Sequence, residues 1–186
     1  TPTWFKLILI VLSCFAVYVA SVRYTGEMHT ANAIHYKNKG NWNYVIKAID
    51  KAYNLNYYEL ENTSTPLLWY RGVAYFNQQK YNLALQDFKD AYEVNPYHVH
   101  VLNNLATSYQ MKGDSKKAKK YYRDVFEVNP TFKESRINLA AILYNEKNYV
   151  EALDVILESK VDPYWKRKKQ NFSDNYDLYL KTIVNS

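Results

Sequence analysis

Glycine and cysteine are scarce in this sequence, with four glycines and one cysteine in 186 residues. The single thiol, at Cys14, excludes a disulfide within the chain. No glycine-rich loop is present to cradle a phosphate, and no serine lies on a nucleophile elbow beside a histidine and an acid. The four histidines lack the neighbouring cysteines or histidines that would complete a metal site. We therefore predict no metal, no other cofactor and no catalytic activity for this segment.

Charge is also sparse, since 23% of the residues are charged and 48% are hydrophobic. This balance indicates a globular chain rather than a disordered one. The formal net charge is +6, from 24 basic and 18 acidic residues. Such a charge permits contact with an anionic membrane but does not require a nucleic acid, and we expect no nucleic-acid partner.

A long apolar run, WFKLILIVLSCFAVYVASV, occupies residues 4–22. Its 19 residues would span about 28 Å as a helix, close to the roughly 30 Å of a bilayer's hydrocarbon core. We interpret residues 1–25 as a transmembrane anchor that places the chain in the lipid bilayer. The alternative is a secretory signal peptide, with Lys6 in its charged region and Val19-Ala20-Ser21 as a cleavage site; we favour the retained helix.

The charges on either side of the apolar run indicate how the helix is oriented in the membrane. Lys6 lies at one end of the apolar run, whereas Arg23, Lys37, Lys39 and Lys47 follow its other end. An excess of cations marks the cytoplasmic side of a membrane segment, so this pattern favours a cytoplasmic location for the rest of the chain. The chain begins without methionine and would fit a piece of a longer protein, in which case upstream charges could reverse the orientation.

A pattern with a period of 34 residues organises the middle of the chain. Pro96 and Pro130 are 34 residues apart, and each follows an asparagine. Small, aromatic and proline positions that recur together at a fixed period indicate a helical repeat. Proline ends the preceding helix, because it lacks an N–H and disfavours helical geometry in the residue before it. The matching positions are Leu68 and Leu102, Gly72 and Ala106, Tyr75 and Tyr109, Ala84 and Ala118, Phe88 and Tyr122, and Ala91 and Val125.

This pattern resembles the tetratricopeptide repeat (TPR) family, in which each repeat is a pair of helices. The resemblance implies an all-α fold, a right-handed superhelix of about four helix pairs. Small residues such as Gly72 and Ala84 would let the two helices of a pair approach closely. The best matches are 65–98 and 99–132.

Two further repeats and a cap complete the predicted stack. Residues 26–59 form a divergent first repeat and residues 133–163 a fourth. The segment 57–64 is a long inter-repeat loop, which we interpret as a tolerated insertion rather than a functional loop. Residues 164–186 are predicted to form a capping helix, because a solenoid needs a polar-backed end.

The TPR resemblance also implies a concave groove lined by the first helix of each repeat. Its side chains here are mostly neutral, aromatic or amide-bearing, which suits an extended peptide or a helix held by rings and by amide hydrogen bonds. The alternative is a groove filled by the chain's own terminal segment. The predicted partner-binding residues are Trp69, Val73, Phe76, Asn77, His100, Asn103, Thr107, Gln110, Tyr144 and Asn145, with Met111, Glu134, Ile137 and Ala141 at further groove positions.

TPR domains that bind chaperone tails hold a terminal carboxylate with lysine and arginine in this groove. None of the groove positions above is a lysine or an arginine. We therefore predict that this chain does not bind chaperone tails.

A looser resemblance concerns the whole protein. The phrases RYTGEMHTANAIHYKNKGNW and STPLLWYRGVAYFNQQKYNLALQDFKDAYEVNP look like the tail of bacterial O-antigen ligase-like membrane proteins, which carry TPRs directly after their last membrane span. This resemblance implies a bacterial inner membrane and a glycan transferase whose catalytic part lies outside this chain. The competing hypothesis is a membrane-anchored TPR scaffold that catalyses nothing.

Two clusters of basic residues need separate interpretations. The run from Lys116 to Arg123 falls on the outer face of a second helix, where a solvated surface is favoured over a nucleic-acid site. A second cluster places four cations beside an aromatic ring and is a candidate for anionic lipid headgroups, with the wet face of the capping helix as the equal alternative. Its residues are Trp165, Lys166, Arg167, Lys168 and Lys169.

Overall fold

The computed structural model describes residues 2–53, 60–61 and 63–157. These residues form eight helices and one isolated antiparallel bridge between Leu60 and Pro66, so the described chain is all-α, as predicted. The predicted capping helix at 164–186 and the basic cluster at 165–169 lie outside the described residues. The helices are α1 (Thr3–Asn38), α2 (Trp42–Tyr53), α3 (Leu67–Asn77), α4 (Tyr81–Val94), α5 (Val99–Met111), α6 (Ser115–Val128), α7 (Lys133–Asn145) and α8 (Tyr149–Leu157).

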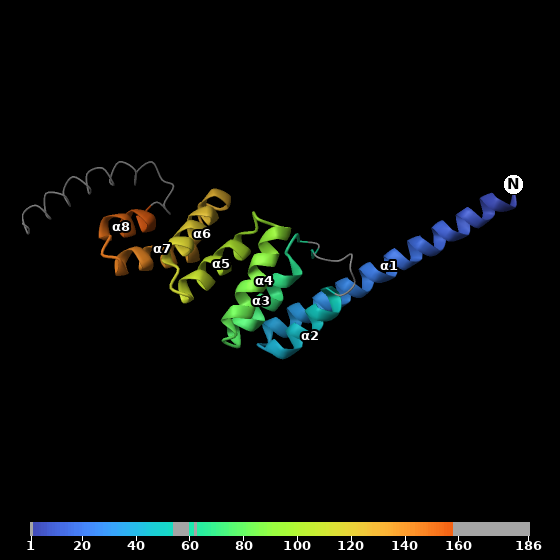
Figure 1. The fold of residues 1–186 in the computed structure, drawn as a ribbon, viewed down its shortest axis with the longest axis horizontal. Helices are drawn as coiled ribbons and strands as arrows, with labels where there is room; N and C mark the ends of the chain where they lie inside the picture. Colours follow the sequence, from blue (N-terminus) through green and yellow to red (C-terminus); the bar gives the residue numbers. More distant parts are fainter. Residues whose placement is uncertain (1, 54–59, 62, 158–186) are drawn as a thin grey trace, which may run out of the picture.

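The helices pack in pairs, and neighbouring pairs stack on one another (Figure 1). In the two central pairs the second helix buries a small residue and an aromatic one at the repeating positions. Ala84 and Phe88 of α4, and Ala118 and Tyr122 of α6, are all fully buried. Burying a large apolar side chain stabilises the folded state by about 1.5–3 kcal/mol. The adjacent helices cover each of these side chains. The periodic residues of the sequence are therefore the core of the stack.

The predicted anchor and the first repeat share one helix. α1 is 36 residues long and runs straight through residue 25, where we placed the end of the anchor. No proline interrupts it, and an ion pair between Arg23 and Glu27 and a hydrogen bond from Thr30 Oγ1 to Gly26 O support its middle turns. Its first half is exposed, while Ala33 is fully buried against α2 and α3. Figure 1 shows α1 projecting far beyond the stack.

The four turns within the pairs repeat one backbone conformation. Gly40, Gln79, Gly113 and Lys147 each occupy the same place in their turn, and each has a positive φ, of 71°, 61°, 77° and 64°. The left-handed conformation favours glycine, because a Cβ comes too close to the following carbonyl oxygen. Two of the four turns therefore contain a residue that is strained by its backbone.

Changing Gly113 to alanine should lower the free energy of unfolding by about 1 kcal/mol. No atom lies within 4 Å of the Cβ that the change adds, so the effect comes from the backbone conformation alone. Changing Gln79 to glycine at the equivalent position should cause no loss. Urea denaturation of the two variants checks this, and an unaffected Gly113→Ala variant would show that the turn does not hold the left-handed conformation.

Candidate functional site on the first-helix face

A row of rings crosses the face formed by the first helices α3, α5 and α7. The ring centroids of Trp69 and His100 are 5.8 Å apart, and those of His100 and Phe132 are 5.5 Å apart. Lys37 of α1 places its Nζ 5.5 Å from the Trp69 ring centre. The row therefore joins four successive first helices. The predicted Trp69 and His100 lie together in it, whereas Lys37 and Phe132 were not predicted.

Phe132 and His98 were not predicted because both lie just before a first helix. Phe132 immediately precedes α7, where it occupies the N-cap, and this position is outside the helical part of the repeat. His98 precedes α5 in the same way and its ring centroid lies 6.2 Å from that of Trp69. The signal in the sequence was the pair of rings 34 residues apart, just before two first helices. The predicted groove set was confined to helical positions and excluded both.

The predicted amide and hydroxyl groups of the groove are used inside the stack. Asn103 Oδ1 accepts a hydrogen bond from Ser135 Oγ at 2.8 Å. Thr107 Oγ1 lies 3.0 Å from the hydroxyl of Tyr122, which donates to Gln110 Oε1 at 2.8 Å. Burial raises the pKa of Tyr122, so its hydroxyl stays protonated as a donor. These contacts position α5 against α6 and α7.

Exposed apolar side chains lie on the same first helices, on α5 and α7. Met111, Ile137 and Tyr144 are 54%, 61% and 63% exposed, which is high for large apolar side chains. Val73 and Phe76 of α3 are half-buried beside the core. The ring of Phe76 packs against Tyr81 and that of Tyr144 against Tyr149, with centroid distances of 5.3 and 5.1 Å.

Asn77 and Asn145, two of the predicted groove residues, are the last residues of α3 and α7 and form no hydrogen bond across the face within the described part of the chain. Asn77 is exposed and donates to the carbonyl oxygen of Val73, four residues earlier, at 2.8 Å. Asn145 is exposed at the last position of α7. The exposed groups on this face are therefore mainly rings and aliphatic side chains.

His98 caps the helix that carries the centre of this face. Its Nδ1 accepts a hydrogen bond from the Val101 N–H at 3.3 Å, and its Nε2 lies 3.3 Å from Thr65 Oγ1. Only a neutral ring with its proton on Nε2 can accept at Nδ1 and donate to Thr65. Burial, and then the neighbouring His100, lower the pKa of His98 from its ordinary value of 6.5.

This lowered pKa predicts a loss of stability in acid. The unfolded chain binds a proton at this histidine more readily than the folded chain, so stability increases with pH. The contribution is complete above about pH 6.5 and is lost as the pH falls through the lower pKa of the folded state. Changing His98 to asparagine keeps a capping group that does not titrate. Urea midpoints measured between about pH 7.5 and pH 5 should fall less for this variant than for the parent, and equal slopes would contradict the assignment.

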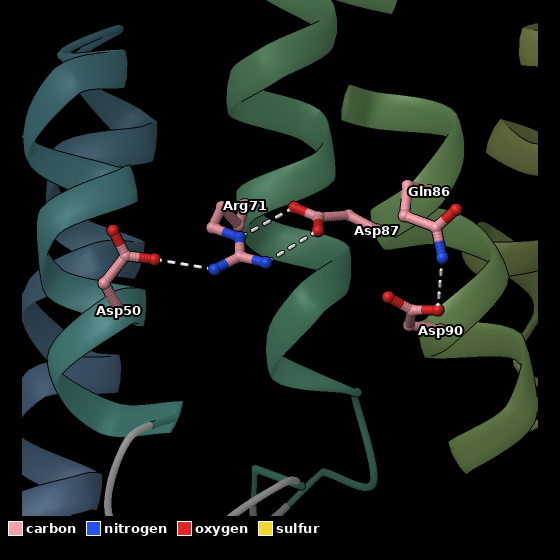
Figure 2. A network of polar contacts seen from close by, with 5 residues as sticks. All are labelled: Asp50, Arg71, Gln86, Asp87 and Asp90. Atoms are coloured by element: carbon pink, nitrogen blue, oxygen red, sulfur yellow. Dashed lines mark hydrogen bonds and ion pairs between the residues drawn. The ribbon is translucent and has the colours of Figure 1, made fainter. Parts of the chain in front are cut away.

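An ion-pair network joins the first helix α3 to the second helices α2 and α4 (Figure 2). Arg71 of α3 donates twice to Asp87 of α4, from Nε and Nη2, both at 2.8 Å. Its Nη1 donates to Asp50 of α2 at 2.7 Å. The hydrogen bonds with Asp87 are the main reason that the pKa of Arg71 is raised, so the guanidinium is always charged. One side chain thus ties together three helices.

The basic run on α6 is largely paired. Lys119 and Arg123 form ion pairs with Glu146 and Glu151 of the last helix pair. Lys117 pairs with Asp114 and Lys120 with Asp124, while Lys116 is exposed. The pairs to α7 and α8 give the run a structural role on the outside of the stack.

Comparison with known proteins decides the family of the central helices. The tetratricopeptide repeat family matches residues 67–98 and 99–132. The chain carries tetratricopeptide repeats. The two matches begin at α3 and at α5, so each TPR contains one of the helix pairs described above. They do not support the resemblance to O-antigen ligase-like proteins.

The TPR stack has relatives of known sequence and structure. Hsp70-Hsp90 organizing protein 3 of Arabidopsis thaliana is 30% identical over 114 residues, which are 61% of this chain and 20% of that protein. The chain thus spans about a fifth of that relative's length. The crystal structure of MamA matches 83% of this chain and 87% of its own, with a TM-score of 0.64 and 18% identity.

Another similar structure contains a ligand. The first TPR of Spaghetti (RPAP3), bound to the HSP90 peptide SRMEEVD, matches 67% of this chain and 94% of its own, with a TM-score of 0.59 and 19% identity. Because the identities to these two solved structures are 18% and 19%, the similarity shows the fold of this chain and no more.

Proposed function

We propose that this chain is a membrane-anchored TPR scaffold whose first-helix face binds a segment of a protein partner. The observation that carries the proposal is the row of rings from Trp69 to Phe132, continued by the exposed apolar side chains Met111, Ile137 and Tyr144. Aromatic and large apolar side chains on a concave repeat surface are the groups that anchor peptides. The first TPR of Spaghetti (RPAP3), which has a similar fold, is bound to an HSP90 peptide.

The chemistry of the face favours a partner segment anchored by apolar side chains. Asn103, Thr107 and Gln110 use side-chain oxygens in internal hydrogen bonds, so rings rather than amides provide the anchoring contacts. The groove positions of α3, α5 and α7 include no lysine or arginine to hold a terminal carboxylate, and the Lys37 ammonium of α1 is engaged over the Trp69 ring. We therefore propose that the chain does not bind a peptide ending in EEVD, although a similar TPR domain does.

Membrane anchoring belongs to the same proposal. α1 contains an 18-residue window with a mean hydropathy of 2.3, and none of that window is buried. A signal sequence near an N-terminus has the same properties, so anchoring needs its own test. N-terminal sequencing of the protein extracted from a bacterial inner membrane should find residues 4–22 still present. A mature protein that begins after Ser21 would refute the anchor. Protease digestion of sealed inner-membrane vesicles tests whether the TPR stack lies on the cytoplasmic side.

Binding at the first-helix face is tested by changing Trp69, Phe76 and Tyr144 to alanine together. Capture of the partner by crosslinking in native membranes should be lost, while circular dichroism should show a folded stack. A matched control changes three exposed apolar residues of the second helices, Tyr44, Leu83 and Val150, and should keep the same crosslinked species. Capture that survives the first variant, or is lost equally in both, would refute the proposed face.

A further inference from the structure

The turns within the helix pairs each carry an exposed lysine. Lys39 lies between α1 and α2, Lys80 between α3 and α4, Lys112 between α5 and α6, and Lys147 between α7 and α8. Within the described part of the chain, none of these four forms an ion pair. Lys116 adds a fifth exposed cation in the first turn of α6.

These turns follow one edge of the stack. Each pair is joined by a tight turn with the same left-handed residue, and neighbouring pairs contact one another throughout. The first helices therefore all run in one direction, and their turns come at the same end. Figure 1 shows the α1–α2 and α3–α4 turns together at the lower end of the stack. We call this edge, with Lys39, Lys80, Lys112, Lys116 and Lys147, the turn edge.

The acids of the turn edge are already engaged. Asp114 accepts a hydrogen bond from the Lys117 N–H, caps α6 and pairs with the Lys117 ammonium. Glu146 pairs with Lys119 of α6. Exposed Glu93 and Glu127 lie at the other end of the second helices, in the last turns of α4 and α6. The turn edge therefore presents an excess of unpaired positive charge.

Helix energetics explain only part of this arrangement. Lys39 and Lys112 occupy C-caps, where a cation interacts favourably with the helix dipole. Lys80 is an N-cap residue and Lys116 lies in a first turn, and a cation there is unfavourable. The helix dipole therefore does not account for the positions of Lys80 and Lys116.

We propose that the turn edge binds an acidic segment of a protein partner, separately from the first-helix face. Successive turns are one helix pair apart, and neighbouring helices pack about 8–10 Å apart, so the spacing from turn to turn is up to about 20 Å. An extended chain rises about 3.3 Å per residue, so a segment with a carboxylate at about every third residue reaches successive turn lysines with every second carboxylate. The four turns contain no aromatic residue for stacking bases, which favours a protein segment over a single-stranded nucleic acid.

The test uses the full chain in a non-ionic detergent and a fluorescent peptide with glutamate at every third position. One variant changes Lys39, Lys80, Lys112 and Lys147 to glutamine. A matched control changes four exposed lysines away from this edge, Lys47, Lys51, Lys89 and Lys133, to glutamine. Both variants lose the same charge. Fluorescence anisotropy should show binding weakened about tenfold or more in the turn-edge variant and little changed in the control.

Several outcomes would overturn the proposal. Equal weakening in both variants would mean that net charge, not the edge, attracts the peptide. Tight binding of a peptide with glutamine in place of glutamate would exclude carboxylate recognition. A single-stranded RNA of equal charge that binds more tightly than the peptide would identify a nucleic-acid surface. Loss of acidic-peptide binding in the Trp69, Phe76 and Tyr144 variant would place the peptide on the first-helix face.

Discussion

Replacing Arg71 with methionine should lower the free energy of unfolding by about 3–5 kcal/mol. The side chain of Asp87 is only 5% exposed, and its carboxylate receives two hydrogen bonds from Arg71. Burial raises the pKa of Asp87, and the hydrogen bonds from Arg71 oppose that rise. Without the guanidinium, a buried carboxylate between α3 and α4 would lose its partner. Urea denaturation of the parent and the variant measures the difference.

Two further variants distinguish the effect of the Arg71–Asp87 pair from that of Asp50. Arg71→Met combined with Asp87→Leu removes both charges and should recover most of the lost stability, because apolar groups can replace a buried ion pair. Asp50→Asn should change stability by less than about 1 kcal/mol, because the Asp50 side chain is 44% exposed. A loss below about 1 kcal/mol in the Arg71→Met variant would show that the Asp50–Arg71–Asp87 network does not hold the three helices together.

Adding a single methyl group at Gly72 should lower the free energy of unfolding by about 1–3 kcal/mol. A Cβ on Gly72 would lie 2.6 and 2.8 Å from two ring carbons of Phe88 and 3.2 Å from the Asp87 Cβ. The Phe88 ring is fully buried, and close packing of protein interiors leaves such a ring little room to move. Thermal and urea unfolding of Gly72→Ala give the measured loss.

The sign of the Gly72→Ala effect is informative by itself. Alanine favours a helix over glycine by about 1 kcal/mol, so a helix without the contact would become more stable. Changing Phe88 to leucine in the same background should make the alanine less harmful, because the ring is then absent. A stabilised Gly72→Ala variant would contradict the close approach of α3 and α4.

The sequence predicted the TPR core well, because its signal is a period. Gly72 opposite Phe88, and Ala118 beside Tyr122, come from residues that recur every 34 positions and are buried in the structure. The periodicity places a residue on the core side of its helix. It does not fix which polar groups bond to one another.

The repeat period did not predict two features of the structure. α1 continues through residue 25 because no proline interrupts it there. The repeat pattern gives the start of a repeat but not whether the preceding helix runs into it. Arg136 takes a place filled by leucine in the two preceding repeats, yet it is 5% exposed. Its guanidinium donates to the carbonyl oxygens of Pro130 and Val155 and lies over the Phe126 ring. Hydropathy alone would place such a residue in solvent.

The repeat pattern also predicted part of the candidate site, namely the residues within the first helices. A helical repeat pattern identifies which face of a helix points to the groove, so it placed Trp69, His100 and Tyr144 on the first helices. Phe132 lies in a turn and Lys37 in the most divergent repeat, where the pattern is weakest. The internal bonding of Asn103 and Gln110 depends on Ser135 and Tyr122, which are distant from them in sequence. Such pairings require three-dimensional contacts.

Hydrogen exchange of the full chain, with and without its captured partner, tests the central claim most directly. Binding at the first-helix face predicts added protection in α3, α5 and α7, greatest around Trp69, His100 and Ile137. The second helices α2, α4 and α6 should change little. Protection confined to the second helices, or to α1 alone, would contradict the account.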